Sequence, residues 1–149
     1  MINDYKPKKR IEYASQDINE DDIKAVIKIL KSDFLTQGPT IAKFENAIKD
    51  YVKVKYSYAT SSASSGLHIA CLALDLGPGD ILWTSPNSFV ASANCAINCG
   101  AKVDFVDIDP DTWNISIEKL EEKLRLAKKR RMLPKILIPV HFAGQPTEQ

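Results

Sequence analysis

A run of small residues, Thr60-Ser61-Ser62-Ala63-Ser64-Ser65-Gly66, is the first segment of the sequence that could bind a ligand. It lies between a predicted strand and a predicted helix. Free backbone N–H groups and the positive dipole end make a helix amino terminus a phosphate site, and serine hydroxyls add donors. Ordinary helix capping by Ser62 or Ser64 explains the same run, and the local sequence alone favours it. The glycine pattern of a dinucleotide-binding turn or P-loop is absent.

Two further residues could share a site with this run. Phe89 follows a predicted strand, and in open parallel sheets ligands bind outside the carboxyl ends of the strands. An aromatic ring there could stack on a flat heterocycle. His141 follows the last predicted strand and is expected at the same edge. Each alone is more simply structural, Phe89 as a core side chain and His141 as a hydrogen-bonding group, but three candidates at one edge support one another.

The three cysteines, Cys71, Cys95 and Cys99, lie in apolar segments and are expected to be small buried side chains in a reducing compartment. Cys95 and Cys99 are one helical turn apart and could face one metal ion. A tetrahedral zinc site would need two more ligands, and only His68 and His141 remain. We therefore expect no metal site.

Helices and strands must alternate to position these residues. Helices are expected over residues 19–32, after Pro39 as far as residue 52, over 67–76 and 90–99, and from 117 into the basic run 128–131, with short strands over 56–60, 81–84, 103–106 and 136–140. This alternation predicts an α/β fold with three layers, α/β/α, and a mostly parallel sheet. The helices at 67–76 and 90–99 are apolar on nearly every side, which predicts burial between layers or at a subunit contact.

Composition and length indicate one ordinary globular domain. The 149 residues are 44% hydrophobic and 26% charged, with a formal net charge of +1. This charge favours neither nucleic acid nor an anionic membrane surface as a partner. No apolar stretch reaches the ~20 residues of a membrane span, and the amino terminus lacks a signal-peptide pattern, so we expect a cytoplasmic protein. Because the sequence stops in a loop soon after its last strand, we expect residues 1–149 to be the incomplete amino-terminal portion of a larger domain.

Eight short motifs occur in the order and spacing of one protein family. They are Leu35-Thr36-Gln37-Gly38-Pro39, Phe44-Glu45, the residues 62–67, 77–80, 88–94, 100–103 and 106–112, and Pro139-Val140-His141-Phe142-Ala143-Gly144-Gln145-Pro146. Each motif is weak alone, whereas eight in register are specific. Over roughly residues 11–149 the sequence resembles the opening of the DegT/StrS sugar-nucleotide aminotransferases.

The resemblance implies the amino-terminal part of a fold-type I large domain in a homodimeric enzyme that uses pyridoxal 5'-phosphate (PLP). By position, Ala63 and Ser64 match residues that hold the PLP phosphate, and Phe89 matches the aromatic that stacks on the ring. Most relatives have Thr in place of Ser64, so the hydroxyl is kept. The positions that match the sugar-nucleotide pocket are Tyr13, Asp33, Phe34, Leu35, Thr36 and Ala63. His141 matches a strand-end histidine with a supportive role.

Two groups that the family needs are not found in this sequence. The Schiff-base lysine lies in a downstream Ser-Phe-His-x-x-Lys motif, and the carboxylate at the pyridine nitrogen also lies downstream. No catalytic residue is therefore assigned, and the chain alone is expected to be inactive. The resemblance implies that the parent transfers an amino group from glutamate to a UDP-linked 4-keto-6-deoxy-hexosamine. The alternative hypothesis is a non-catalytic α/β module that binds a phosphate ligand or a partner through residues 60–66.

Overall fold

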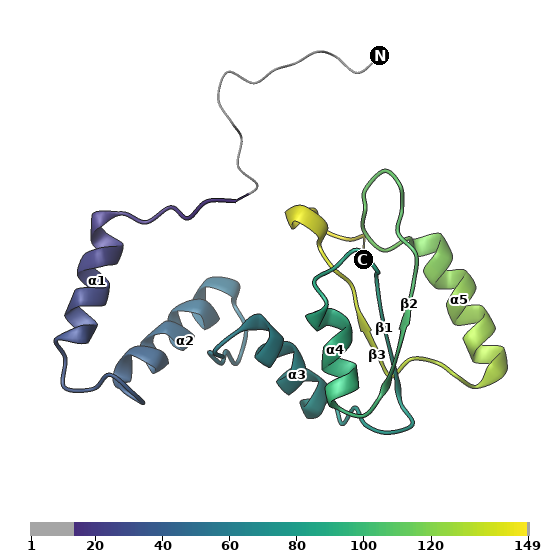
Figure 1. Ribbon diagram of the computed structural model, residues 1–149, viewed down its shortest axis with the longest axis horizontal. Coiled ribbons are helices and arrows are strands. Elements are labelled where there is room, and N and C mark those ends of the chain that lie inside the picture. The colour runs from purple at the N-terminus through teal and green to yellow at the C-terminus, as the bar shows by residue number, and fades with distance from the viewer. Residues whose placement is uncertain (1–13, 149) are drawn as a thin grey trace, which may run out of the picture. The chain divides into compact units, whose positions relative to one another are not determined.

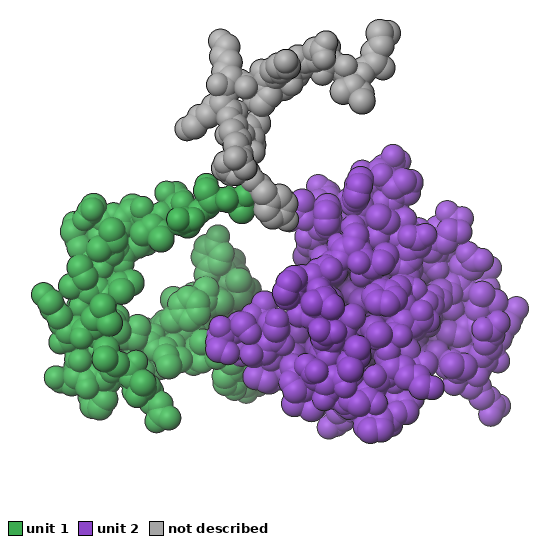
Figure 2. Space-filling model, viewed as in Figure 1, with its two compact units in different colours: residues 1–59 green, residues 60–149 purple. Residues whose placement is uncertain are grey.

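The chain forms two compact units, residues 1–59 and 60–149, in a computed structural model that describes residues 14–148 (Figure 2). The contacts within the chain divide at residue 59. The two units are described one at a time.

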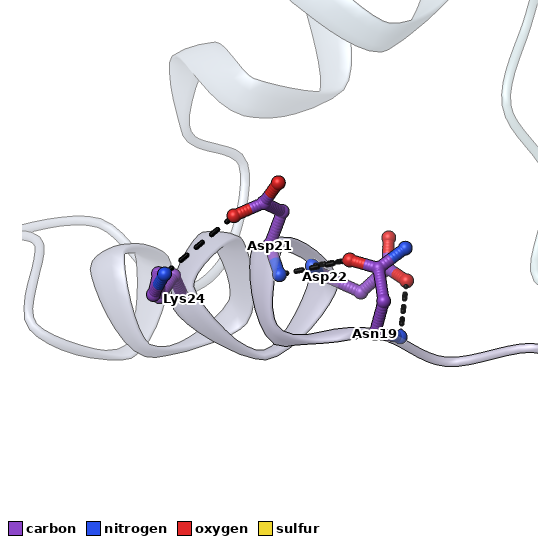
Figure 3. Close-up of polar contacts among 4 residues, drawn as sticks. All are labelled: Asn19, Asp21, Asp22 and Lys24. Carbon is purple, nitrogen blue, oxygen red and sulfur yellow. Dashed lines mark hydrogen bonds and ion pairs between the residues drawn. The ribbon is translucent and has the colours of Figure 1, made fainter.

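The first unit contains two amphipathic helices, α1 (Glu20–Leu30) and α2 (Pro39–Val52). Asn19 caps α1, because its Oδ1 accepts the N–H groups of Asp21 and Asp22 at 2.8 and 3.3 Å (Figure 3). In return, Asp22 Oδ2 accepts the Asn19 N–H at 2.9 Å, which completes a capping box. Both predicted helices are confirmed. Neither buries a side chain within the described residues, so local signals rather than a core define them.

The second unit is built on three parallel strands, β1 (Ile81–Thr84), β2 (Lys102–Phe105) and β3 (Ile136–Ile138), in the order β2-β1-β3. Leu82 of β1 pairs with Val103 and Ile136. Helices α3 (Ala63–Ala73) and α4 (Ala91–Asn98) pack together, and α4 lies on β1 and β2. Helix α5 (Ile117–Arg130) covers the opposite face of the sheet (Figure 1). The predicted three-layer α/β/α fold with a parallel sheet is confirmed.

Alternation along β1 produces the two cores of this unit, because successive strand side chains point to opposite faces. Leu82 is fully buried among α3 and α4 residues that include Cys71 and Cys95. Trp83 faces the other way and packs with Val106, Ile115 and Ala127 under α5. Lys123 joins α5 to this face, since its Nζ lies 2.7 Å from Asp104 Oδ2 and 4.8 Å from the centre of the Trp83 ring.

Two sequence predictions about secondary structure are wrong. Residues 56–60 form no strand, because they have no strand partner within the described chain, and the Ala59 N–H instead donates to Glu45 Oε1 at 2.9 Å. The helix expected over 67–76 begins four residues earlier, at Ala63, and ends at Ala73. The remaining strands and helices lie within about two residues of their predicted bounds, a normal uncertainty for element ends.

The apolar helices are buried on one side only. Helix α3 buries Cys71 alone, and α4 buries Ala91, Ser92, Cys95 and Ala96, while Leu72 and Ile97 remain exposed. Cys71 and Cys95 are buried free thiols as predicted, and Cys99 is half-buried. Burial raises the pKa of the Cys71 thiol to about 12. Residues 14–148 place no three His, Cys, Asp or Glu side chains where they could share a metal ion.

An ion pair joins the residues that precede β1 and β3, at the end of the sheet where the strands begin. Asp80 Oδ2 accepts the Lys135 ammonium at 2.9 Å and the Gly77 N–H at 3.0 Å. Lys135 also donates to the Asp75 carbonyl oxygen, so one side chain joins the start of β3 to the turn before β1. The Lys135 hydrogen bond, supported by the Gly77 N–H, lowers the pKa of Asp80.

This lowered pKa predicts an acid-sensitive contribution to stability. Asp80 stabilises the fold above the ordinary carboxyl pKa of about 4, and the contribution is lost as pH falls through its lower folded-state pKa. Asp80→Asn should therefore lower the thermal midpoint at neutral pH and flatten its decline below about pH 4. Asp75→Asn is the control, because the Asp75 carboxylate makes no hydrogen bond among the described residues. Equal acid dependence in wild type and Asp80→Asn would contradict this account.

Candidate functional site at the carboxyl ends of the strands

Ser62 is the residue that caps α3. Its Oγ accepts the Ser65 N–H at 3.2 Å, and its carbonyl oxygen accepts the Thr60 hydroxyl at 3.0 Å. An added Cβ on Gly66 would lie 3.3 Å from Thr60 Oγ1, so glycine keeps this turn compact. Because Ser62 is the cap, the helix begins at Ala63, and the Ser64 hydroxyl takes no part in capping.

Ala63 and Ser64 occupy the first two positions of α3 and are exposed. Among residues 14–148 their backbone N–H groups and the Ser64 hydroxyl have no hydrogen-bond partner. The Ser65 hydroxyl lies 3.1 Å from the Ser62 hydroxyl and 3.3 Å from the Ser61 hydroxyl. Donors and the positive end of the helix dipole thus converge at one place, which can bind an anion such as a phosphate group.

Phe89 lies between β1 and α4, and the residue is 75% exposed. The interpretation of Phe89 as a core side chain covering the sheet is therefore wrong. A hollow of about 150 Å³ lies beside it, and Ser85 and Phe105 also line this hollow. The Ser88 and Ser92 hydroxyls lie 2.7 Å apart at the start of α4 and hold the turn that carries Phe89. An exposed aromatic ring on a turn that is held by a hydrogen bond can stack on a planar ligand.

His141 follows β3 and precedes a short 3-10 helix, η1 (Phe142–Gly144). Its Nδ1 accepts the Thr147 N–H at 3.1 Å. The imidazole is exposed at the surface, whereas Thr147 is buried. The ring is therefore held from one side by the backbone of its own loop.

Chain direction brings two of these residues to the same edge of the sheet. Phe89 and His141 each follow a strand of a parallel sheet, so both lie at its carboxyl edge. Helix α3 ends just before β1 begins, so its amino terminus is the end of the helix that lies away from the start of β1. The structure thus places Phe89 and His141 at one edge of the sheet, and Ala63 and Ser64 at the end of α3 that lies away from the start of β1.

The other predicted positions lie in the first unit or outside the described residues. Asp33, Phe34, Leu35 and Thr36 form the exposed loop between α1 and α2. A Cβ on Gly38 would lie 2.9 Å from Phe34 Cβ and 3.0 Å from the Phe34 carbonyl oxygen, so this loop folds back tightly and requires glycine. Tyr13 lies outside the described residues.

Asn114, which no sequence pattern marks as a candidate, organises the loop that carries His141. Asn114 is 4% exposed, and its Oδ1 accepts the Phe142 N–H at 2.9 Å. Its Nδ2 donates to the carbonyl oxygens of Gln145 and Pro146, both at 3.1 Å. An Asn beside the turn at 107–111 is typical of the turn itself, so the local sequence gave no signal of these distant partners.

Asp109 shapes the turn that presents Asn114. Its Oδ1 accepts the Thr112 N–H at 2.8 Å, the Thr112 hydroxyl at 3.1 Å and the Asp111 N–H at 3.0 Å. These bonds, that of the Thr112 N–H above all, lower the pKa of Asp109. The Asp109 N–H in turn donates to the Asn114 carbonyl oxygen at 2.8 Å. A charged Asp109 therefore fixes the backbone from which the Asn114 side chain reaches the β3 loop.

A model of the DegT/DnrJ/EryC1/StrS aminotransferase family matches residues 16–149. The chain belongs to this family. It is 41% identical over 138 residues to the UDP-4-amino-4,6-dideoxy-N-acetyl-β-L-altrosamine transaminase of Campylobacter jejuni, which covers 93% of this chain and 35% of that protein. The predicted family is confirmed.

Solved structures of DegT/DnrJ/EryC1/StrS aminotransferases share the fold. Helicobacter pylori PseC, an aminotransferase of pseudaminic acid biosynthesis, matches with a TM-score of 0.83 and 30% identity over 94% of this chain and 36% of that one. NtdA of Bacillus subtilis, solved with the cofactor PMP (the aminated form of PLP), matches with a TM-score of 0.74 and 31% identity over 88% of this chain and 30% of that one.

The chain spans about a third of the length of the curated relatives that it matches. The activity, substrates and partners of the full-length relatives are therefore only proposed for this protein. No helix among residues 14–148 combines the length and the apolar character that crossing a membrane requires.

Proposed function

We propose that the protein to which this chain belongs is a PLP-dependent sugar-nucleotide aminotransferase. It transfers an amino group from glutamate to a UDP-linked 4-keto-6-deoxy-hexosamine. The observation that carries the proposal is the family match over residues 16–149, together with 41% identity to a transaminase that acts on a UDP-linked amino sugar. We further propose a cytoplasmic homodimer, with residues 1–149 as the amino-terminal portion of its large domain.

The residues of the candidate site fit a phosphorylated aromatic cofactor. Among residues 14–148 the N–H groups of Ala63 and Ser64 and the Ser64 hydroxyl have no partner, so they suit a phosphate, and the exposed Phe89 suits a pyridine ring. When bound, PLP supplies an electron sink for the transfer of the amino group. This chain's part is to bind the phosphate at α3 and to orient the ring against Phe89.

The substrate contacts are assigned by position in the family. Asp33, Phe34, Leu35 and Thr36, together with Tyr13 and Ala63, are proposed to line the sugar-nucleotide pocket. Their support is an exposed, tightly folded α1–α2 loop whose polar and apolar groups remain available to a ligand. No catalytic residue is assigned among residues 1–149.

The non-catalytic module is the weaker hypothesis. Its support was that the sequence lacks the family's lysine and ring-nitrogen carboxylate motifs. Because the chain spans about a third of its relatives, those motifs can lie in the rest of the protein, and their absence here does not favour a module. The free donors of α3 are equally compatible with both hypotheses.

A reduction experiment tests the proposed function. The full-length protein is mixed with PLP, treated with borohydride and analysed by peptide mass. We expect a reduced PLP adduct on one lysine beyond residue 149, and amino transfer from glutamate to the UDP-keto sugar before reduction. The 149-residue chain is the matched control and should give no adduct specific to one lysine. A reading frame that ends at residue 149, or a specific adduct on a lysine within it, would contradict the proposal.

A further inference from the structure

Two loops at the carboxyl edge of the sheet are joined through one buried side chain. Among the described residues, the Asn114 side-chain amide makes three hydrogen bonds, and all three partners belong to the loop after β3, 28 to 32 residues away along the chain. The rings of Trp113 and Phe142 stack beside it, with centres 6.0 Å apart and planes 18° from parallel. A buried polar side chain with its donors and acceptor all paired specifies one arrangement of the backbone around it.

That arrangement determines the hydrogen-bonding state of His141. The Thr147 N–H can only donate, so the Nδ1 atom that it contacts at 3.1 Å must be the unprotonated nitrogen. In the neutral imidazole, the proton then lies on Nε2. Thr147 is 7% exposed and follows directly on the two residues whose carbonyl oxygens Asn114 binds, so its N–H cannot turn away while that loop is held.

We propose that Asn114 is a positioning residue that presents His141 to a ligand as a hydrogen-bond donor through Nε2–H. Within the described chain, Nε2 has no partner, and the imidazole is exposed at the carboxyl edge of the sheet, where Phe89 also lies. The ligand group that suits it is an oxygen with negative charge, whether a carboxylate, a phenolate or a phosphate oxygen. With Nδ1 occupied, His141 does not serve as a base. The identity of the ligand rests on the proposed function, whereas the tautomer does not.

Nuclear magnetic resonance of the 149-residue chain with ¹⁵N-labelled histidine tests the tautomer. His68, the other histidine, is replaced by Gln so that one imidazole is observed. At a pH where the ring is neutral, we expect Nε2 to be the protonated nitrogen in this His68→Gln background. Protonation at Nδ1 would overturn the proposal without need of any further variant.

Three variants test the route through Asn114. Thr147→Pro removes the N–H donor, and Asn114→Ala releases the loop, so both should shift population toward the Nδ1–H tautomer. Thr147→Ala keeps the N–H and should leave the tautomer unchanged. Circular dichroism shows whether each variant is folded. If Asn114→Ala unfolds the chain, Thr147→Pro against Thr147→Ala decides, and an unchanged tautomer in folded Thr147→Pro would overturn the proposal.

The full-length protein tests the ligand. His141→Asn keeps an N–H donor, whereas His141→Leu has none, so His141→Leu should weaken the binding of PLP or of glutamate about tenfold or more, with substantial rescue in His141→Asn. Separate titrations with PLP and with glutamate identify which oxygen is bound. Equal affinities in His141→Leu and wild type for both compounds would refute the assigned ligand class. A protein that binds neither would refute the proposed function and leave the tautomer result standing.

Discussion

Phe89→Ala should weaken PLP binding by the full-length protein by about tenfold to a hundredfold, because stacking of an aromatic side chain on a heterocyclic base contributes roughly 1–3 kcal/mol. Phe89 is 75% exposed and belongs to neither core, so the substitution should leave the free energy of unfolding within about 0.5 kcal/mol of wild type. Equilibrium dialysis against PLP measures the affinity.

Two comparisons make this result specific to stacking. Phe89→Tyr keeps the ring and should retain most of the affinity, whereas a loss as large as that of Phe89→Ala would indicate a steric effect. Ser64→Ala should also weaken binding, with Ser64→Thr, which keeps the hydroxyl, as its control. If neither Phe89→Ala nor Ser64→Ala changes the affinity, the site assignment is wrong even though the family is right.

Leu82→Ala should lower the free energy of unfolding of the chain by about 2–5 kcal/mol, the usual range for a buried leucine. Leu82 is 0% exposed on the central strand, between Val103 and Ile136, and packs against Cys71 and Cys95. A loss of this size is a large part of the 5–15 kcal/mol typical of whole domains. We therefore expect the urea midpoint of residues 60–149 to fall well below that of the wild type.

Urea denaturation followed by circular dichroism measures the effect. Leu137→Ala is the matched control, because Leu137 lies on the neighbouring strand β3 but is 37% exposed. Leu137→Ala should lower the free energy of unfolding by about 1 kcal/mol or less, because the Leu137 side chain buries a smaller part of its apolar area than Leu82 does. A Leu82→Ala variant as stable as Leu137→Ala would show that the core does not depend on the central strand.

Local signals predicted most of the fold. The capping box at Asn19 and the apolar spacing of α1 and α5 are contained within single segments, so the sequence displays them. Residues 56–60 show the limit of such signals. Their tyrosines favour a strand, but strand formation requires a neighbour to pair with, and the described chain provides none there.

The residues of the candidate site also differ in whether local sequence signals predict them. Ser64 and Phe89 were predictable, because a helix start and a strand end can be located from neighbouring residues. The predicted start of α3 at residue 67 is four residues late, because the hydroxyl run is not a turn but contains the helix cap, Ser62. The role of Asn114 could not be predicted from the sequence, since its partners lie 28 to 32 residues away and only the folded chain brings them near.

The strand order β2-β1-β3 also bears on how the sheet assembles during synthesis. The central strand emerges from the ribosome first, and β2 pairs with it after a short connection through α4. The other edge of β1 stays unpaired until β3 has been synthesised. The Ile138 carbonyl oxygen of β3 then accepts a hydrogen bond from the Thr84 hydroxyl, 54 residues earlier in the chain. Closing the longer loop loses more chain entropy. We infer that β3 docks last, with Lys135 reaching Asp80 only as the sheet is completed.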